Sequence, residues 1–212
     1  MTLVKICGVT LPDDAARVAA SGADFVGLNF WPRSKRYLAP ARAPLIAAVA
    51  RASGPAKLVG VFVDPHLDEV LAIHAAIQLD AIQLHGDEAP EFCAQVATAA
   101  KVPVWKAIPV SAPRDVEPLQ VWPVDALLLD APTPGRGGAG ARFDHQLARL
   151  ARERHPARRF VLAGGLTPET VAAAIALVAP WAVDVASGIE AAPGIKDPAK
   201  LAAFLAAVAQ SR

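Results

Sequence analysis

Eight short apolar segments, rich in β-branched residues, recur along the chain, and their alternation with other segments limits the fold more than any other feature. They occupy residues 3–7, 25–30, 57–63, 81–85, 102–108, 126–130, 160–164 and 182–187. Alanine-rich stretches with helical spacing separate most of them. Strands that alternate with helices are typical of a parallel sheet with crossover connections. The pattern therefore predicts an α/β protein.

Several of the stretches between the segments begin with a helix N-terminal signature, in which a proline accompanies acidic or hydroxyl side chains. The signatures lie at 12–14, 65–69, 88–91, 167–169 and 197–198. Proline suits a first helical turn because the N–H that it lacks has no partner there. The fifth connection, 111–123, contains three prolines and is expected to hold the weakest helix.

Eight strand–helix units can close into a (β/α)₈ TIM barrel or lie open as a doubly wound sheet. The spacing is uniform, with no linker or shift in composition, and 212 residues give roughly 26 per unit. We therefore expect an α/β protein with a single (β/α)₈ barrel domain over residues 1–212.

Composition and charge narrow the classes of function. With 21 Lys and Arg against 20 Asp and Glu, the net charge of +1 does not favour a nucleic-acid partner. The longest apolar stretch, 171–183, contains a proline and is too short for a membrane span, and no signal-peptide pattern opens the sequence. Cys7 and Cys93 form no zinc ribbon or disulfide framework, and common nucleotide motifs are absent. We expect a cytoplasmic protein that binds no metal and is a monomer by default, with a homodimer as the alternative.

In barrels of this class the functional groups lie at the carboxyl ends of the strands. Two adjacent ends, 162–169 and 184–190, carry glycines that let backbone N–H groups converge on a phosphate. Tight turns explain one such pair of glycines equally well, but two neighbouring strands that end this way favour a phosphate site. A third cluster, 135–140, follows the sixth strand and would close over the same group. The candidate phosphate ligands are the backbone groups of Gly138, Gly140, Gly164, Gly165, Ser187 and Gly188.

Cys7 and Asp130 are a candidate base and acid. Cys7 ends the first segment two residues after Lys5, so strand alternation places both on one face, where the ammonium would lower the thiol pKa. Asp130 ends an apolar segment, where burial would raise the pKa of its carboxyl and keep it protonated. Taken alone, Cys7 could equally be a buried packing residue, and Asp130 could equally cap the loop that follows it. Together, a base and an acid in one pocket suit isomerisation by proton transfer.

Five further residues are candidates for substrate binding. Arg36, in the loop 31–38, would bind a carboxylate through two hydrogen bonds. Gln83 and His85 share one face of the fourth strand, and a hydrogen-bonded histidine at the rim is the simpler interpretation of His85. Closure of the barrel would bring Asp184 beside Lys5, and we expect the two to form an ion pair.

Seven motifs stand out along the chain, and six of them contain these residues. They are KICGVT (5–10), GLNFWPRSKRYL (27–38), VGVFVD (59–64), QLHGDE (83–88), LLLDAPTPGRGGAGARFD (127–144), LAGGLTPETV (162–171) and DVASGIEAAPGIKD (184–197). Through them the chain resembles, nearly end to end, the phosphoribosylanthranilate isomerases of tryptophan biosynthesis.

The resemblance implies an Amadori rearrangement of N-(5'-phosphoribosyl)anthranilate without metal or organic cofactor. By the family's motifs, Cys7 would remove the C2' proton and Asp130 would protonate the furanose ring oxygen. Arg36 would hold the anthranilate carboxylate, and the glycine-rich turns would hold the phosphate.

Four positions depart from the usual family pattern, namely Asp64, Ala139, His145 and Ala186. Ala139 and Ala186 lack hydroxyls that are common near the phosphate, so we assign that contact to the backbone. Two rival functions stay open. One is the related isomerase of histidine biosynthesis, which uses paired aspartates where this chain has Cys7. The other is a phosphate-ligand binding barrel without catalysis.

Overall fold

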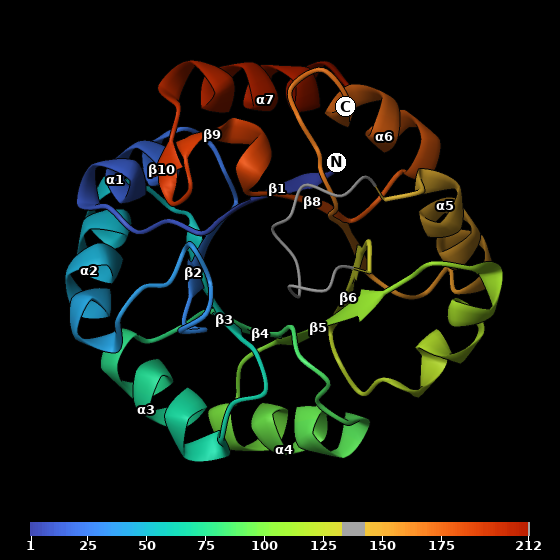
Figure 1. The fold of residues 1–212 in the computed structure, drawn as a ribbon, viewed down its shortest axis with the longest axis horizontal. Helices are drawn as coiled ribbons and strands as arrows, with labels where there is room; N and C mark the ends of the chain where they lie inside the picture. Colours follow the sequence, from blue (N-terminus) through green and yellow to red (C-terminus); the bar gives the residue numbers. More distant parts are fainter. Residues whose placement is uncertain (133–142, 212) are drawn as a thin grey trace.

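The structure is a computed structural model that describes residues 1–132 and 143–211. Eight parallel strands pair in chain order and close into a barrel, with a ring of helices outside it (Figure 1). The strands are β1 Leu3–Cys7, β2 Phe25–Asn29, β3 Lys57–Phe62, β4 Ala81–Leu84, β5 Val104–Pro109, β6 Ala126–Asp130, β7 Phe160–Leu162 and β8 Ala182–Val185. Pairing of β1 with β8 closes the barrel, so the (β/α)₈ prediction is confirmed and the open sheet is excluded.

The outer ring is formed by α-helices and short 3₁₀ helices. The α-helices are α1 Pro12–Ala20, α2 Ala43–Ser53, α3 Leu67–Ile77, α4 Pro90–Ala100, α5 His145–Arg154, α6 Val171–Val178 and α7 Pro198–Gln210. The 3₁₀ helices are η1 Pro40–Arg42, η2 Pro113–Asp115, η3 Glu117–Val121 and η4 Ser187–Ile189. A small hairpin, β9 Glu190–Ala192 with β10 Ile195–Lys196, precedes α7.

Only some of the helices begin as the sequence signals predict. At α7 the side chain of Asp197 accepts hydrogen bonds from the N–H groups of Ala199 and Lys200, as an N-cap does. At α1 the N-cap is Leu11, which has no capping side chain, so the signature at 12–14 supplies only proline and acidic residues in the first turn. Residues 167–169 form a turn before α6 rather than its start. The proline-rich fifth connection forms η2 and η3 instead of an α-helix, which confirms it as the weakest unit.

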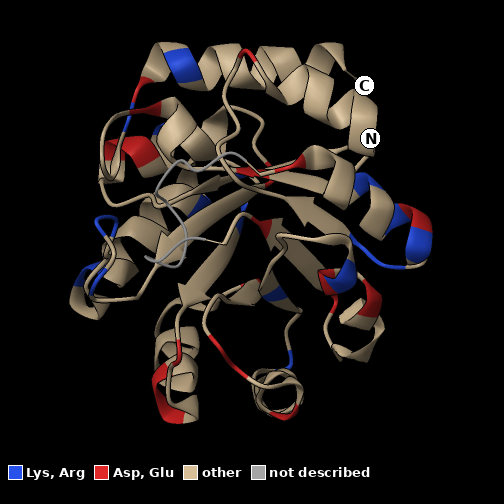
Figure 2. Ribbon diagram, turned by 45° about the vertical axis from the view of Figure 1, so that its right-hand side comes forward, with Lys and Arg blue, Asp and Glu red and all other residues tan. Residues whose placement is uncertain are grey.

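Two apolar cores meet at the barrel wall, because alternate residues of each strand point to opposite sides. One cluster lies between the strands and the helices, and includes Val26, Leu58 and Val183. The other fills the barrel interior, and includes Phe25, Val59, Trp105, Leu128 and Val161. Lys, Arg, Asp and Glu lie mainly on the helices and in the loops, with few within the strands (Figure 2).

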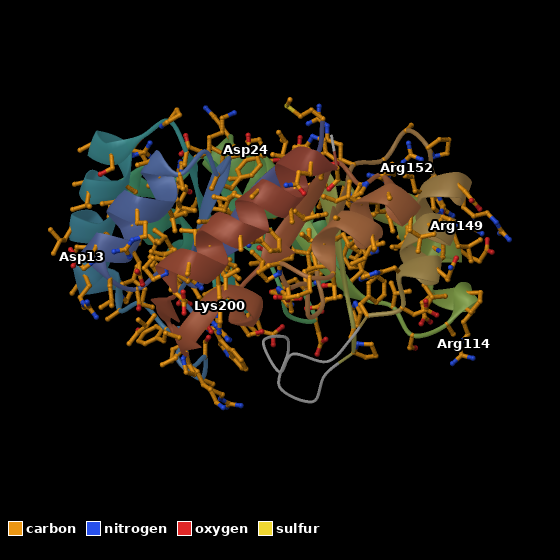
Figure 3. The ribbon with its side chains drawn as sticks, turned by 90° about the horizontal axis from the view of Figure 1, so that it is seen from above. Asp13, Asp24, Arg114, Arg149, Arg152 and Lys200 are labelled. Carbon is orange, nitrogen blue, oxygen red and sulfur yellow. The ribbon has the colours of Figure 1, made fainter. Side chains whose placement is uncertain are left out.

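The barrel has two distinct ends. Figure 3, a view across the barrel axis, places Asp24, which precedes β2, at one end and Arg114, which follows β5, toward the other. The second end is where the strands finish. The inward-facing rows continue into polar side chains there, so the interior core becomes the floor of a candidate site.

Candidate active site

Lys5 and Cys7 are the inward-facing residues of β1 at this end of the barrel. Neighbouring Gly27 of β2 gives them room, because a Cβ there would lie 3.0 Å from the Cys7 sulfur and 3.1 Å from Cε of Lys5. Lys5 is fully buried, and its ammonium lies 2.9 Å from a carboxylate oxygen of Asp184 on β8. The predicted ion pair across the closure of the barrel is confirmed.

The electrostatics of Cys7 differ from the expectation. Burial raises the pKa of the thiol above its ordinary value, the Lys5 ammonium lowers it, and the Asp184 carboxylate raises it again. The net shift is upward. The predicted lowering of the Cys7 pKa is therefore wrong, because burial outweighs Lys5 and because Lys5 is already paired with Asp184.

Asp130 ends β6 and has the environment that the sequence predicted. Burial raises the pKa of its carboxyl to about 6, although the N–H of Ala131, 2.8 Å away, donates to the charged form and lowers it. The Asp184 carboxylate adds a smaller upward shift. A carboxyl with a pKa near neutrality can serve as a proton donor.

Gln83 and His85 connect β4 to Asp130. The side-chain amide nitrogen of Gln83 lies 2.9 Å from Nδ1 of His85, and Nε2 of His85 lies 3.8 Å from a carboxylate oxygen of Asp130. The interpretation of His85 as a hydrogen-bonded rim residue is confirmed, but its other nitrogen faces the candidate acid. Oε1 of Gln83 is buried without a hydrogen-bond partner among the described residues.

Arg36 is not an open side chain on a loop, as the sequence suggested. It is 8% exposed, and its Nε and Nη2 donate to the two carboxylate oxygens of Glu190 at 2.8 and 2.7 Å. The Glu190 hydrogen bonds raise the pKa of the guanidinium against the opposing effect of burial. The two-bond carboxylate contact predicted for Arg36 is thus made within the chain, by a residue that the sequence analysis missed.

The two predicted phosphate-binding turns pack against each other after β7 and β8. Gly164 and Gly165 adopt φ of +88° and +72°, which favours glycine. A Cβ at Gly188, in η4, would lie 1.9 Å from the carbonyl oxygen of Leu166, so only glycine allows this contact. Ser187 begins η4. Gly138 and Gly140, together with the substitution at Ala139, lie outside the described residues.

Glu88 and Lys106 were also missed by the sequence analysis. A carboxylate oxygen of Glu88 lies 3.1 Å from the ammonium of Lys106, and both side chains are buried. Lys106 also donates to the carbonyl oxygen of Gly86 at 2.7 Å. This ion pair fixes the turn that follows His85. The available signal was a lysine in the middle of an apolar strand, which requires a buried partner.

The sequence predicts neither a metal site nor a membrane span. Within 1–132 and 143–211, no three His, Cys, Asp or Glu side chains gather as metal ligands. No helix in that part of the chain has the length and hydropathy needed to cross a membrane.

Comparison with known proteins identifies the family. The model of the N-(5'-phosphoribosyl)anthranilate (PRA) isomerase family matches residues 4–207. The chain belongs to the PRA isomerase family. Among PRA isomerases, the one from Ralstonia nicotianae is 42% identical over 218 residues, with 99% of this chain and 94% of the relative covered. That from Thermotoga maritima is 43% identical over 210 residues, with 97% of each chain covered.

Solved PRA isomerase structures agree with this assignment. The Thermotoga maritima enzyme superposes with a TM-score of 0.89 at 42% identity, covering 99% of this chain and 100% of that chain. A second PRA isomerase structure, with a TM-score of 0.86 at 40% identity and the same coverage, is a complex with reduced 1-(o-carboxyphenylamino)-1-deoxyribulose 5-phosphate. The resemblance seen in the seven motifs is therefore confirmed.

Proposed function

We propose that this chain catalyses the Amadori rearrangement of N-(5'-phosphoribosyl)anthranilate to 1-(2-carboxyphenylamino)-1-deoxyribulose 5-phosphate in tryptophan biosynthesis. The observation that carries the proposal is the placement of Cys7 and Asp130, a candidate base and acid, at one mouth of a barrel of the PRA isomerase family. This is an isomerisation by general acid–base catalysis, and the residues proposed for it are protein side chains alone.

Asp130 is the proposed general acid. It protonates the furanose ring oxygen as the ring opens, and the nitrogen lone pair forms a protonated imine with C1'. The pKa of about 6 suits this role, because a carboxyl with an ordinary pKa would rarely carry a proton near neutrality.

Cys7 is the proposed general base. The imine withdraws electrons and acidifies C2', so the Cys7 thiolate takes the C2' proton and leaves an enolamine. Protonation at C1' and loss of the proton from the C2' hydroxyl then give the ketone at C2'. The Lys5 ammonium, on the same face of β1, stabilises the thiolate when it forms.

Substrate binding is assigned to the other polar groups at this end of the barrel. The backbone groups of the two glycine turns, with Gly138 and Gly140 from the third cluster, are proposed to hold the phosphate. Arg36 is proposed to hold the anthranilate carboxylate, with Gln83, His85, Lys5 and Asp184 around the sugar. The raised Asp130 pKa and the close contact of the two glycine turns support these assignments.

Domain organisation, location, partner and oligomeric state complete the proposed function. We propose one barrel domain, a cytoplasmic location and a phosphorylated small molecule as the only partner. A monomer is the default, with a homodimer as the alternative, since a solved Thermotoga maritima relative is described as dimeric.

The direct test adds the purified protein to freshly made N-(5'-phosphoribosyl)anthranilate and follows anthranilate fluorescence. A loss of fluorescence that scales with protein concentration is expected. Binding without turnover would instead support a non-catalytic barrel. No effect on this substrate, with turnover of the corresponding histidine-pathway aminoaldose, would support the related isomerase.

A further inference from the structure

Three charged side chains, Arg36, Glu190 and Lys196, are buried together beside the end of β1. Their exposed fractions are 8%, 7% and 2%. Burial of a charge is unfavourable unless partners replace the lost water. Glu190 and Lys196 take no part in the proposed chemistry, so their place beside the site needs its own explanation.

The Glu190 carboxylate is the centre of this cluster. Oε1 accepts from Nε of Arg36 at 2.8 Å, from Nζ of Lys196 at 2.9 Å and from the N–H of Gly194 at 3.1 Å. Oε2 accepts from Nη2 of Arg36 at 2.7 Å. Burial raises the pKa of Glu190, but the hydrogen bonds and charges of Arg36 and Lys196 outweigh it and hold the pKa below its ordinary value. Glu190 is therefore a fixed, ionised acceptor.

The contact with Glu190 uses only one edge of the Arg36 guanidinium. A guanidinium has five N–H donors, and the Nε–Nη2 edge supplies two of them to Glu190. No residue in 1–132 or 143–211 accepts from Nη1. The Nη1–Nη2 edge therefore remains for a second carboxylate, in a direction set by the first. The aliphatic part of the Arg36 side chain is confined as well, because its Cδ would lie only 2.4 Å from a Cβ added at Gly8.

The charge balance of the cluster depends on Lys196. Two cations and one carboxylate leave a net charge of +1, whereas Arg36 and Glu190 alone would be neutral. Lys196 is held in place because its ammonium also donates to the Cys7 carbonyl oxygen at 2.6 Å and its backbone N–H donates to Asp14 at 2.8 Å. The β9–β10 hairpin thus brings a compensating cation to the end of β1.

We propose that Glu190 is the positioning residue that aims Arg36, and that Lys196 offsets the charge of Glu190, so that the cluster selects ligands that carry a carboxylate. The inference rests on the proposed function, in which Arg36 receives the carboxylate of the substrate. It goes beyond that function by assigning ligand selectivity to two residues that do not contact the ligand.

The test compares two ligands that differ only in the carboxyl group. They are reduced 1-(2-carboxyphenylamino)-1-deoxyribulose 5-phosphate and its counterpart made from aniline, and the ratio of their Kd values is the carboxylate preference. The parent protein is expected to prefer the carboxylated ligand by about tenfold to a hundredfold, as for a hydrogen-bonded charged pair. Lys196→Met and Glu190→Gln are each expected to lower this preference by about tenfold. Lys57→Met, the same change at an exposed lysine at the start of β3, is the control and is expected to change nothing.

A second pair of more conservative variants keeps the test decisive if Lys196→Met or Glu190→Gln does not fold. Lys196→Arg retains the positive charge and is expected to retain most of the preference. Glu190→Asp retains the net charge but withdraws the carboxylate by one methylene, and is expected to lose preference. Circular dichroism confirms that each variant is folded before Kd is measured.

Three outcomes would overturn the inference. Equal weakening of both ligands in Lys196→Met would indicate a purely structural role. A stronger carboxylate preference in Glu190→Gln would show that charge alone governs selectivity. A parent protein that isomerises its substrate but binds both ligands equally would overturn the inference and leave the proposed function standing. A parent that prefers the carboxylated ligand but shows no turnover would overturn the function alone.

Discussion

Lys5 and Asp184 join the first and last strands of the barrel through an ion pair of 2.9 Å, directly beneath Cys7 in the inward row of β1. The two residues are 179 positions apart in sequence and opposite each other in the strand register. They act on the Cys7 thiol in opposite directions, since Lys5 lowers its pKa and Asp184 raises it. The pair therefore couples barrel closure to the acidity of the proposed base.

Substitution of Lys5 tests this coupling. In Lys5→Met the cation that favours the thiolate is gone, while burial and Asp184 still raise the pKa of Cys7, so the pKa is expected to rise further. The measurement is the pH dependence of iodoacetamide alkylation, made in a Cys93→Ala background so that one thiol remains. A midpoint that is unchanged or shifted to lower pH would contradict the assignment.

The pH profile of kcat/KM is expected to be bell-shaped. Turnover needs Cys7 deprotonated and Asp130 protonated, yet the pKa of Asp130 is about 6 and that of Cys7 lies above its ordinary 9.0. Below pH 6 the thiolate fraction falls, and above the Cys7 pKa the protonated Asp130 fraction falls. Between the two pKa values the fraction of protein in the active form is constant and small. Limbs near pH 6 and above pH 9 are expected, and a maximum confined below pH 6 would be inconsistent with these roles.

Gly188→Ala tests the contact between the phosphate-binding turns. The added Cβ would meet the Leu166 carbonyl oxygen at 1.9 Å, so the turns must separate. Affinity for the phosphorylated product analogue is expected to fall by at least about tenfold. The control is Gly22→Ala, where φ is +88° but no atom lies within 4 Å of the new Cβ. It is expected to cost stability by about 1–2 kcal/mol without loss of affinity. Equal affinities in the two variants would remove Gly188 from the site.

Lys106→Met tests the buried ion pair below the turn after β4. Its removal leaves the Glu88 carboxylate buried without a cation, at an expected cost of about 3–5 kcal/mol. For a chain of this size that corresponds to a Tm lower by roughly 6–20 °C. Thermal unfolding followed by circular dichroism measures it, with exposed Lys57→Met as the matched control. A Tm within about 2 °C of the parent would mean that the pair contributes little.

The barrel was predictable because its strands are buried on both sides. The apolar segments 3–7 and 126–130 coincide with β1 and β6, and the others differ from their strands by one or two residues at an end. The start of α6 was less predictable. The signature at 167–169 is satisfied by a turn in which the N–H of Thr167 donates to the Thr170 hydroxyl, a local competitor of helix formation.

The sequence predicted which residues lie together in the site better than it predicted their pKa values. Strand alternation placed Lys5 with Cys7, and closure placed Asp184 with Lys5. The pKa of Cys7 was wrong because sequence shows which charges are near but not how deeply the thiol is buried. The partner of Arg36 was missed because Glu190 is 154 positions away and reaches it only when the β9–β10 hairpin folds back on β1.

The most direct test of the account is the measurement of kcat and product-analogue affinity for the parent protein, Cys7→Ala and Asp130→Asn, with Cys93→Ala as the control. Cys7→Ala and Asp130→Asn are expected to lower kcat by at least about a hundredfold each, with affinity changed by less than about threefold. Cys93→Ala, which changes a buried residue of α4, is expected to leave kcat and affinity near those of the parent. If either site variant keeps the parent kcat, or loses affinity in proportion to kcat, the assignment of Cys7 as base and Asp130 as acid is contradicted.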